Sequence, residues 1–172
     1  MGTERESESG AVMRLRIFPL ALLIVTDAMP AGVAGDARGP VVRIHPDMWT
    51  RGDEGLLQHE LEHVRQFYRM WILSTIVNAP LAGWLALHFA SPLSPLQAAL
   101  AVGISCLAMH PLLYLRSRTY RELAEVDAYR VQMRYPDGKG GQLSLDDAAA
   151  RLAGPRYGLG ITAVEAGELL AG

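Results

Sequence analysis

Residues 56–77 read LLQHELEHVRQFYRMWILSTIV and contain neither glycine nor proline. In the first half, apolar residues such as Leu57, Leu61 and Val64 recur at the three- and four-residue intervals of one helical face. From Trp71 onward no charged residue follows on any side of such a helix. The stretch therefore predicts a helix that begins amphipathic and becomes apolar all round.

The amphipathic part contains HELEH at residues 59–63, which matches the pattern H-E-x-x-H. His59 and His63 lie four residues apart and share a helical face, so both imidazoles can bind one metal ion with Glu60 beside them. Zinc (Zn2+) suits such a site because it accepts nitrogen ligands in tetrahedral geometry and can keep one position open for water. The pattern predicts hydrolysis in which Glu60 takes a proton from the activated water. The alternative is a solvent-exposed Glu/His face on an ordinary amphipathic helix.

Zinc hydrolases use a third protein ligand, and a second polar helix supplies candidates for it. Residues 121–129 read RELAEVDAY, with Glu125-Val126-Asp127-Ala128 as an E-x-x-A sequence. Together, H-E-x-x-H and E-x-x-A resemble the gluzincins, zinc peptidases that bind the metal through two histidines and a later glutamate.

The resemblance to gluzincins implies that Glu125 is the third ligand and that the small Ala128 lets the two helices approach. Glu122 is the alternative, because it lies one turn earlier on much the same face. Asp127 is turned roughly 200° away around the helix and cannot share that face. Tyr129 stands where many gluzincins have the Asp or Asn that orients a ligand histidine. Its hydroxyl or the Glu122 carboxylate is expected to make that hydrogen bond, unless Tyr129 is only a packed aromatic residue.

Two apolar stretches separate the HELEH sequence from Glu125. Residues 71–90 and 96–115 each run for about twenty residues without Asp, Glu, Lys or Arg, which is enough to cross a bilayer. A Ser/Pro-rich turn at residues 91–95 joins them, so we expect a transmembrane helical hairpin, in which Asn78 and His110 lie at similar depth. The alternative is a buried helical pair, which a chain of this size could hardly enclose.

Arginines mark the outer ends of both apolar stretches, whereas the turn between them has neither Lys nor Arg. These arginines are Arg65, Arg69, Arg116, Arg118 and Arg121. By the positive-inside rule both ends of the hairpin face the cytoplasm, as in a bacterial inner membrane. If both helices run on past the membrane surface, the hairpin returns Glu125 to the height of the two histidines, with zinc just above the cytoplasmic face.

This layout, over about Val41 to Gln132, resembles the HtpX-like membrane-integral metallopeptidases, and its soluble part is similar to minigluzincins. The chain lacks the transmembrane pair that HtpX-like enzymes carry before the active-site helix. The resemblance implies a membrane-embedded, zinc-dependent endopeptidase acting on polypeptides near the bilayer. The alternatives are a catalytically inactive zinc-binding membrane regulator, an interaction protein without zinc, or a hydrolase of other substrates.

The expected fold is α+β and mainly helical, with a zincin-like pair of ligand-bearing helices joined by the membrane hairpin. We predict a disordered tail at 1–12, one domain at 13–135 with the hairpin inserted at 71–115, and a C-terminal helical extension at 136–172. At the N-terminus, Leu15–Val25 and Val41–His45 are expected to pair as a small β-hairpin. The alternative for the first of these segments is a signal-peptide-like sequence.

The C-terminal part predicts a helix over Leu143–Leu152 and a last helix opened by the capping box Thr162–Glu165. Tyr157, between them, could reach the site and stabilise an oxyanion, although a packed or exposed tyrosine is the simpler interpretation. A net charge of -2 gives no electrostatic reason to expect nucleic acid as a partner. The single Cys106 excludes an intrachain disulfide. The sequence does not indicate an oligomeric state.

Overall fold

The computed structural model describes residues 12–16, 19–89 and 91–172 of the chain. The protein is α+β and mostly helical, as predicted, with one small four-stranded sheet. The predicted disorder of residues 1–12 lies outside the described residues except for Val12, the first residue of a strand. The elements are β1 (Val12–Arg16), β2 (Ala21–Val25), β3 (Gly35–Arg38), β4 (Val41–Ile44), α1 (Pro46–Arg51), α2 (Glu54–His88), α3 (Pro95–Ser105), the short 3-10 helix η1 (Cys106–Ala108), α4 (Met109–Arg116), α5 (Arg118–Gln132), α6 (Leu145–Leu152) and α7 (Ala163–Ala171).

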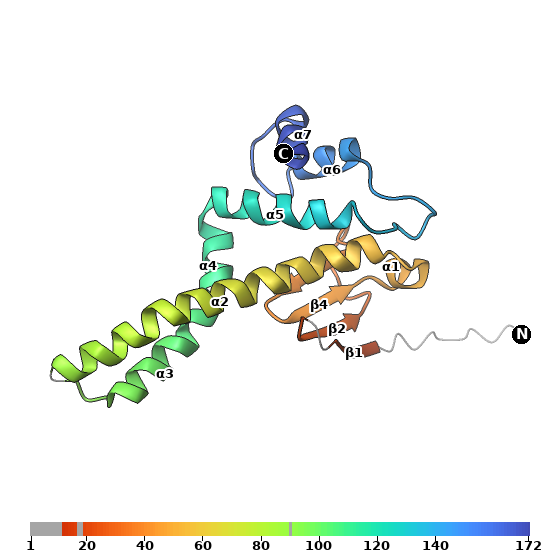
Figure 1. Cartoon of the computed structure of the whole chain (residues 1–172). Helices are drawn as coiled ribbons and strands as arrows, with labels where there is room; N and C mark the ends of the chain where they lie inside the picture. Colours follow the sequence, from red (N-terminus) through yellow and green to blue (C-terminus); the bar gives the residue numbers. More distant parts are fainter. Residues whose placement is uncertain (1–11, 17–18, 90) are drawn as a thin grey trace, which may run out of the picture.

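Helix α2 is the axis of the molecule and runs without interruption for 35 residues (Figure 1). The predicted continuous helix is therefore confirmed. The Asp53 side chain caps its start by accepting a hydrogen bond from the Leu56 N–H at 2.9 Å. Pro80 lies within the helix without ending it. The buried residues of α2 all belong to the stretch from Gly55 to Phe67, so only its first half serves as a core helix.

The sheet covers the first half of α2 on one side. Its strand order is β1-β2-β4-β3, and β2 and β4 run parallel. Alternate residues of β2, namely Ala21, Leu23 and Val25, are buried. Ala21 and Leu23 form one core cluster with Leu57 and Leu61 of α2. A half-covered sheet of this kind requires such alternation.

The predicted β-hairpin between Leu15–Val25 and Val41–His45 is wrong. The first segment contains the end of β1 and the whole of β2, which pair antiparallel, and β2 also pairs with β4 in parallel. The antiparallel partner of β4 is β3, which it follows after a turn at Gly39, whose φ is 59°. Parallel pairing needs a longer crossover, and the segment that carries β3 provides it.

Helix α3 runs back along the second half of α2, as expected for a helical hairpin (Figure 1). The two backbones approach closely at Gly83 and Gly103: a Cβ at Gly83 would lie 3.3 Å from the Pro95 carbonyl oxygen. The Trp71 indole N–H donates to the Gly103 carbonyl at 3.0 Å. Both α2 and the segment Pro95–Arg116 are long and apolar enough to cross a membrane.

The apolar windows of these two helices are only 6% and 11% buried within the protein. The exposed side chains include Ile76 and Leu81 on α2 and Leu96 and Leu100 on α3. A buried pair of helices in a soluble core, the alternative from sequence, does not describe this arrangement.

The second apolar stretch is not one straight helix. α3 gives way to η1, and α4 then changes direction and crosses α2 toward α5 (Figure 1). Pro111 contributes to this break because it has no N–H to continue the helical ladder. The expectation that Asn78 and His110 lie at similar depth is therefore wrong. The Asn78 amide donates to the Ser74 carbonyl, whereas His110 packs against Phe67 nearer the sheet.

The second helix also does not run on to Glu125, contrary to expectation. Ser117 has extended backbone angles (φ -106°, ψ 110°) and caps a new helix, α5, by accepting from the Tyr120 N–H. Helix α5 then lies antiparallel to the first half of α2, since the Gln66 amide donates to the Ala124 carbonyl while Gly55 adjoins Gln132.

The predicted C-terminal helices are confirmed as α6 and α7, and Thr162 and Glu165 form the expected capping box. Both helices pack on the side of α5 that carries Val126 and Tyr129. Leu152 of α6 is fully buried there.

We expect Leu61→Ala to lower the free energy of unfolding by about 2–5 kcal/mol, because Leu61 is 1% exposed and its removal leaves a cavity between α2 and the sheet. Chemical denaturation of the purified protein measures this change. Leu81→Ala on the same helix is the matched control, since Leu81 is 51% exposed and its truncation should cost less than about 0.5 kcal/mol. Equal losses for the two variants would contradict the described core.

Candidate metal centre

Helices α2 and α5 bring His59, His63 and Glu125 together. One ligand atom from each of the three side chains lies within 4.8 Å of the others. His59 Nε2 is 3.6 Å from Glu125 Oε2, and His63 Nε2 is 3.5 Å from Glu125 Oε1. Two ligand atoms on a tetrahedral zinc ion lie roughly 3.4 Å apart when both bonds are 2.0–2.1 Å long. The spacing therefore fits a metal ion bound by all three residues.

The close approach of the two helices depends on small residues. Ala124 and Ala128 of α5 are 5% and 0% exposed. At the other end of the contact, a Cβ at Gly55 of α2 would lie 3.1 Å from the Gln132 carbonyl oxygen. A larger side chain at these positions would push α5 outward and separate Glu125 from the histidines.

Glu125 is 1% exposed, and its Oε2 atom has no hydrogen-bond partner within the described part of the chain. Buried carboxylate oxygens are normally paired, so an oxygen without a hydrogen bond, 3.6 Å from the His59 Nε2 atom, fits a ligand to a cation. The donor set of two nitrogens and one carboxylate is typical of hydrolytic zinc sites. The residues present therefore fit zinc.

Electrostatics around Glu125 favour its charged form. Burial alone would raise the pKa of Glu125, but His63, His59 and the Tyr114 hydroxyl outweigh burial and hold this pKa at about 2. Glu125 is thus available as a negatively charged ligand throughout the neutral range.

Two residues that support this cluster were not predicted from the sequence. The Gln66 side chain forms a hydrogen bond with His63 Nδ1 at 3.0 Å and donates another to the Ala124 carbonyl at 2.9 Å. These two bonds fix the ring of His63 against α5. Tyr114 of α4 donates its hydroxyl to Glu125 Oε1. Gln66 could have been found from its position three residues after His63. Tyr114 could not, because its approach depends on the bend between α3 and α4.

Glu60 lies next to the cluster and is 5% exposed. Burial raises the pKa of Glu60 to about 7, with a further increase from Glu125 and an opposing effect from His63. Gly35 of β3 makes room for this side chain, since a Cβ there would lie 3.0 Å from Glu60 Oε1. A carboxylate that titrates near neutrality, beside the ligand atoms, is suited to general-base chemistry.

The other three predicted site residues are placed as follows. The Tyr129 ring lies edge-on to His59 with centroids 4.7 Å apart, and its hydroxyl bonds the Tyr157 hydroxyl at 2.8 Å. Burial raises the pKa of both tyrosines, so both keep their protons near neutrality. Glu122, the alternative ligand, is not among the residues that gather around the histidines.

The predicted site residues other than Glu122, together with Tyr114, line a cleft of about 1230 Å³. Strand β3, an edge of the sheet, forms one wall. The His45 N–H donates to the Ala34 carbonyl, which marks a hydrogen-bonded pair in the β3–β4 ladder. Because such pairs alternate in antiparallel strands, the backbone N–H and C=O groups of Gly35 and Ala37 point away from β4 and into the cleft.

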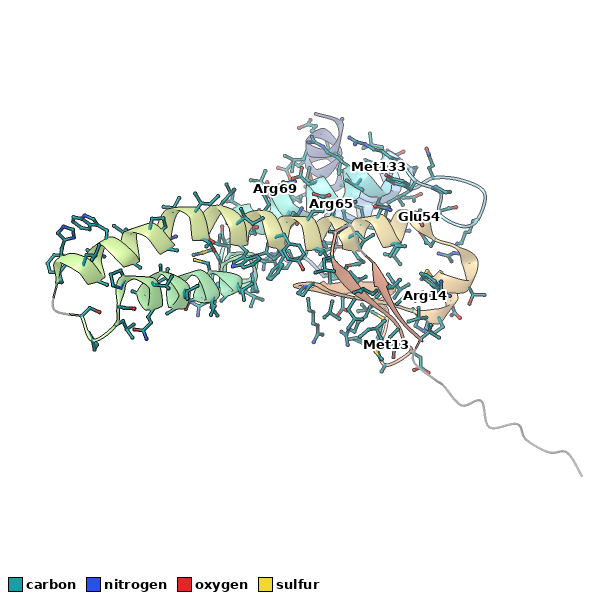
Figure 2. The ribbon with its side chains drawn as sticks, turned by 60° about the horizontal axis from the view of Figure 1, so that its bottom comes forward. Met13, Arg14, Glu54, Arg65, Arg69 and Met133 are labelled. Atoms are coloured by element: carbon teal, nitrogen blue, oxygen red, sulfur yellow. The ribbon has the colours of Figure 1, made fainter. Side chains whose placement is uncertain are left out.

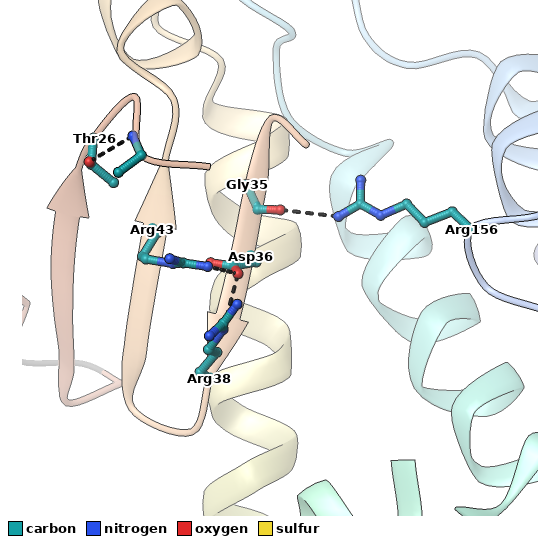
Figure 3. Close-up of polar contacts among 7 residues, drawn as sticks. Thr26, Gly35, Asp36, Arg38, Arg43 and Arg156 are labelled. Atoms are coloured by element: carbon teal, nitrogen blue, oxygen red, sulfur yellow. Dashed lines mark hydrogen bonds and ion pairs between the residues drawn. The ribbon is translucent and has the colours of Figure 1, made fainter. Parts of the chain in front are cut away.

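Charged side chains form hydrogen bonds and ion pairs with the residues of β3 (Figure 3). The Gly35 carbonyl accepts a hydrogen bond at 3.4 Å from Arg156, which lies on the opposite side of the cleft. On β3 itself, Asp36 pairs with Arg43 and Arg38. Although burial alone would raise the pKa of Asp36, the two arginines lower it, so Asp36 stays ionised.

Comparison with known proteins gives no match to any protein-family model, curated protein or solved structure. The case for a function therefore rests on the arrangement of the side chains and on the sequence motifs that carry them.

Glu125→Gln should abolish stoichiometric zinc binding, because it removes the only carboxylate that the described residues place between both histidines. Zinc content of the purified protein after dialysis, measured by atomic emission, tests this. Glu122→Gln, one turn earlier on α5, is the matched control and should retain the metal. Loss of zinc in the Glu122 variant alone would identify Glu122 as the ligand instead.

Proposed function

We propose that the protein is a membrane-embedded, zinc-dependent endopeptidase that acts on polypeptides at the membrane surface. One observation carries the proposal: three ligand-type side chains and a buried glutamate with a pKa near 7 converge in a cleft that has an edge strand as its wall. The resemblance of the H-E-x-x-H and E-x-x-A motifs to those of gluzincins supports peptide bonds as the substrate.

The parts of the cleft suit peptide hydrolysis in distinct ways. His59, His63 and Glu125 would hold zinc, which when bound supplies a Lewis acid and lowers the pKa of water. Glu60 accepts the proton of the attacking water and returns it to the leaving amine. A substrate strand can pair with the outward N–H and C=O groups of Gly35 and Ala37.

Two tyrosine hydroxyls are further hydrogen-bond donors of the cleft. Tyr157 and Tyr129 keep their protons and lie beside the His59/His63/Glu125 cluster. Either hydroxyl can stabilise negative charge on the substrate oxygen during attack. The Arg156 guanidinium adds positive charge on the same side.

The exposed apolar surfaces of α2 and of α3 with α4 support a place in a bilayer. In Figure 2 the side chains along the far part of this hairpin are mostly apolar, whereas Arg65 and Arg69 lie on α2 before the apolar part begins. Together with the uncharged turn at residues 91–95, this distribution favours a cytoplasmic metal site and an outward turn. A bacterial inner membrane is the setting that this orientation suits.

Glu60→Gln should lower the turnover number for peptide hydrolysis by about 10²–10⁴-fold while zinc stays bound, because the amide cannot accept the proton of water. A fluorescence-quenched casein assay in detergent, run beside metal analysis, measures both quantities. Glu62→Gln is the matched control within the same motif, since Glu62 pairs with Arg65 and not with the cluster.

Full activity of the Glu60 variant would contradict the assigned role. A wild-type protein that binds one zinc ion and cleaves no polypeptide would favour the catalytically inactive zinc-binding regulator. A wild-type protein without zinc would favour an interaction protein.

The proposed topology predicts that a cysteine in the turn is labelled only from outside the cell. Cys106 is the single cysteine of the chain, so Cys106→Ala gives a cysteine-free background for Leu93→Cys and, in the C-terminal helix, Val164→Cys. A membrane-impermeant maleimide applied to intact spheroplasts should label position 93, and position 164 should react only after lysis. Labelling of both positions from the same side would contradict a spanning hairpin.

A further inference from the structure

Helix α4, the end of the second apolar stretch, contacts the His59/His63/Glu125 cluster directly through Tyr114. Its hydroxyl donates to Glu125 Oε1, and its ring stands edge-on to His63 with centroids 6.1 Å apart. Arg121 of α5 holds the residue from the other side: Nη1 donates to the Tyr114 carbonyl at 3.2 Å, and the guanidinium lies 6.0 Å from the centre of the Tyr114 ring.

The bend between α3 and α4 places Tyr114 there. After η1, helix α4 crosses α2 and meets the beginning of α5 (Figure 1). A second tyrosine lies at the same junction, where the Tyr120 hydroxyl is 2.7 Å from His110 Nδ1. A straight continuation of α3 along α2 would not bring residue 114 to α5.

The two oxygens of Glu125 differ in their surroundings. Oε1 accepts the Tyr114 hydroxyl, whereas Oε2 is buried and has no hydrogen-bond partner among the described residues. Carboxylates can bind divalent ions through one oxygen or through both. A hydrogen bond on one oxygen favours binding through the other, and a single-oxygen ligand leaves room for water in the fourth position.

We propose that Tyr114 is a positioning residue that restricts Glu125 to one metal-binding oxygen, Oε2, and so keeps the site four-coordinate. The inference deepens the proposed function and rests on it, because it assumes that the cluster binds a metal ion. It also makes the apolar hairpin a part of the metal site, since the restricting hydroxyl belongs to the second apolar helix.

Tyr114→Phe tests the proposal, because it removes the hydroxyl and keeps the ring. Zinc affinity of the purified full chain is measured by competition with a chelator, and coordination is read from the visible absorption of the Co2+-substituted protein. We expect a zinc affinity about 10–100-fold weaker than wild type, the usual effect of losing a partner of a metal ligand. We also expect weaker Co2+ bands, as a second carboxylate oxygen enters the coordination shell. Tyr120→Phe, which removes the neighbouring hydroxyl of the same junction, should match wild type in both measurements.

Wild-type affinity together with a wild-type Co2+ spectrum in Tyr114→Phe would overturn the inference. A weaker affinity with an unchanged spectrum would also overturn it, because Tyr114 would then only support the fold. If the wild-type protein binds neither metal, the proposed function fails first, and the two failures are thus distinguished.

Should phenylalanine not be tolerated, 3-fluorotyrosine at position 114 keeps the ring and strengthens the hydroxyl as a donor. A Co2+ spectrum that keeps its four-coordinate bands supports the inference in that protein, and weaker bands contradict it.

Discussion

The rest of the structure depends on one buried carboxylate. Glu125 has almost no contact with solvent, and an isolated charge in such a position would be strongly destabilising. Two imidazoles from α2 and one hydroxyl from α4 face it. Helices α2, α4 and α5 must therefore be correctly placed before Glu125 can be buried. The small residues of α5, the bend after α3 and the cap at Ser117 can all be understood as conditions for that meeting.

The sequence predicted the parts of the molecule whose cause is local. The helical spacing of Leu57, Leu61 and Val64 gave α2, and four-residue spacing put His59 and His63 on one face. Capping chemistry gave the start of α7 at Thr162. These features depend on residues a few positions apart, and periodicity and side-chain type are enough to infer them.

What the sequence did not predict depends on distant contacts. The parallel pairing of β2 with β4 depends on β3, which lies between them in sequence and pairs with the other edge of β4. The residues of β2 and β4 do not indicate this pairing by themselves. The residues around the bend between α3 and α4 have a composition that also suits a straight apolar helix. Tyr114 was overlooked for the same reason, since its role exists only once the bend is made. Glu125 rather than Glu122 was chosen by resemblance, and the geometry brings Glu125 to the histidines.

The division of the cluster across the hairpin has a consequence for how the protein is made. During synthesis the two histidines leave the ribosome first, the two apolar helices next, and Glu125 last. The three side chains therefore cannot meet in a nascent chain until both apolar helices have been completed. A chain released before that point carries the histidines and Glu60 without their third partner. The order of translation thus keeps the complete cluster out of unfinished chains.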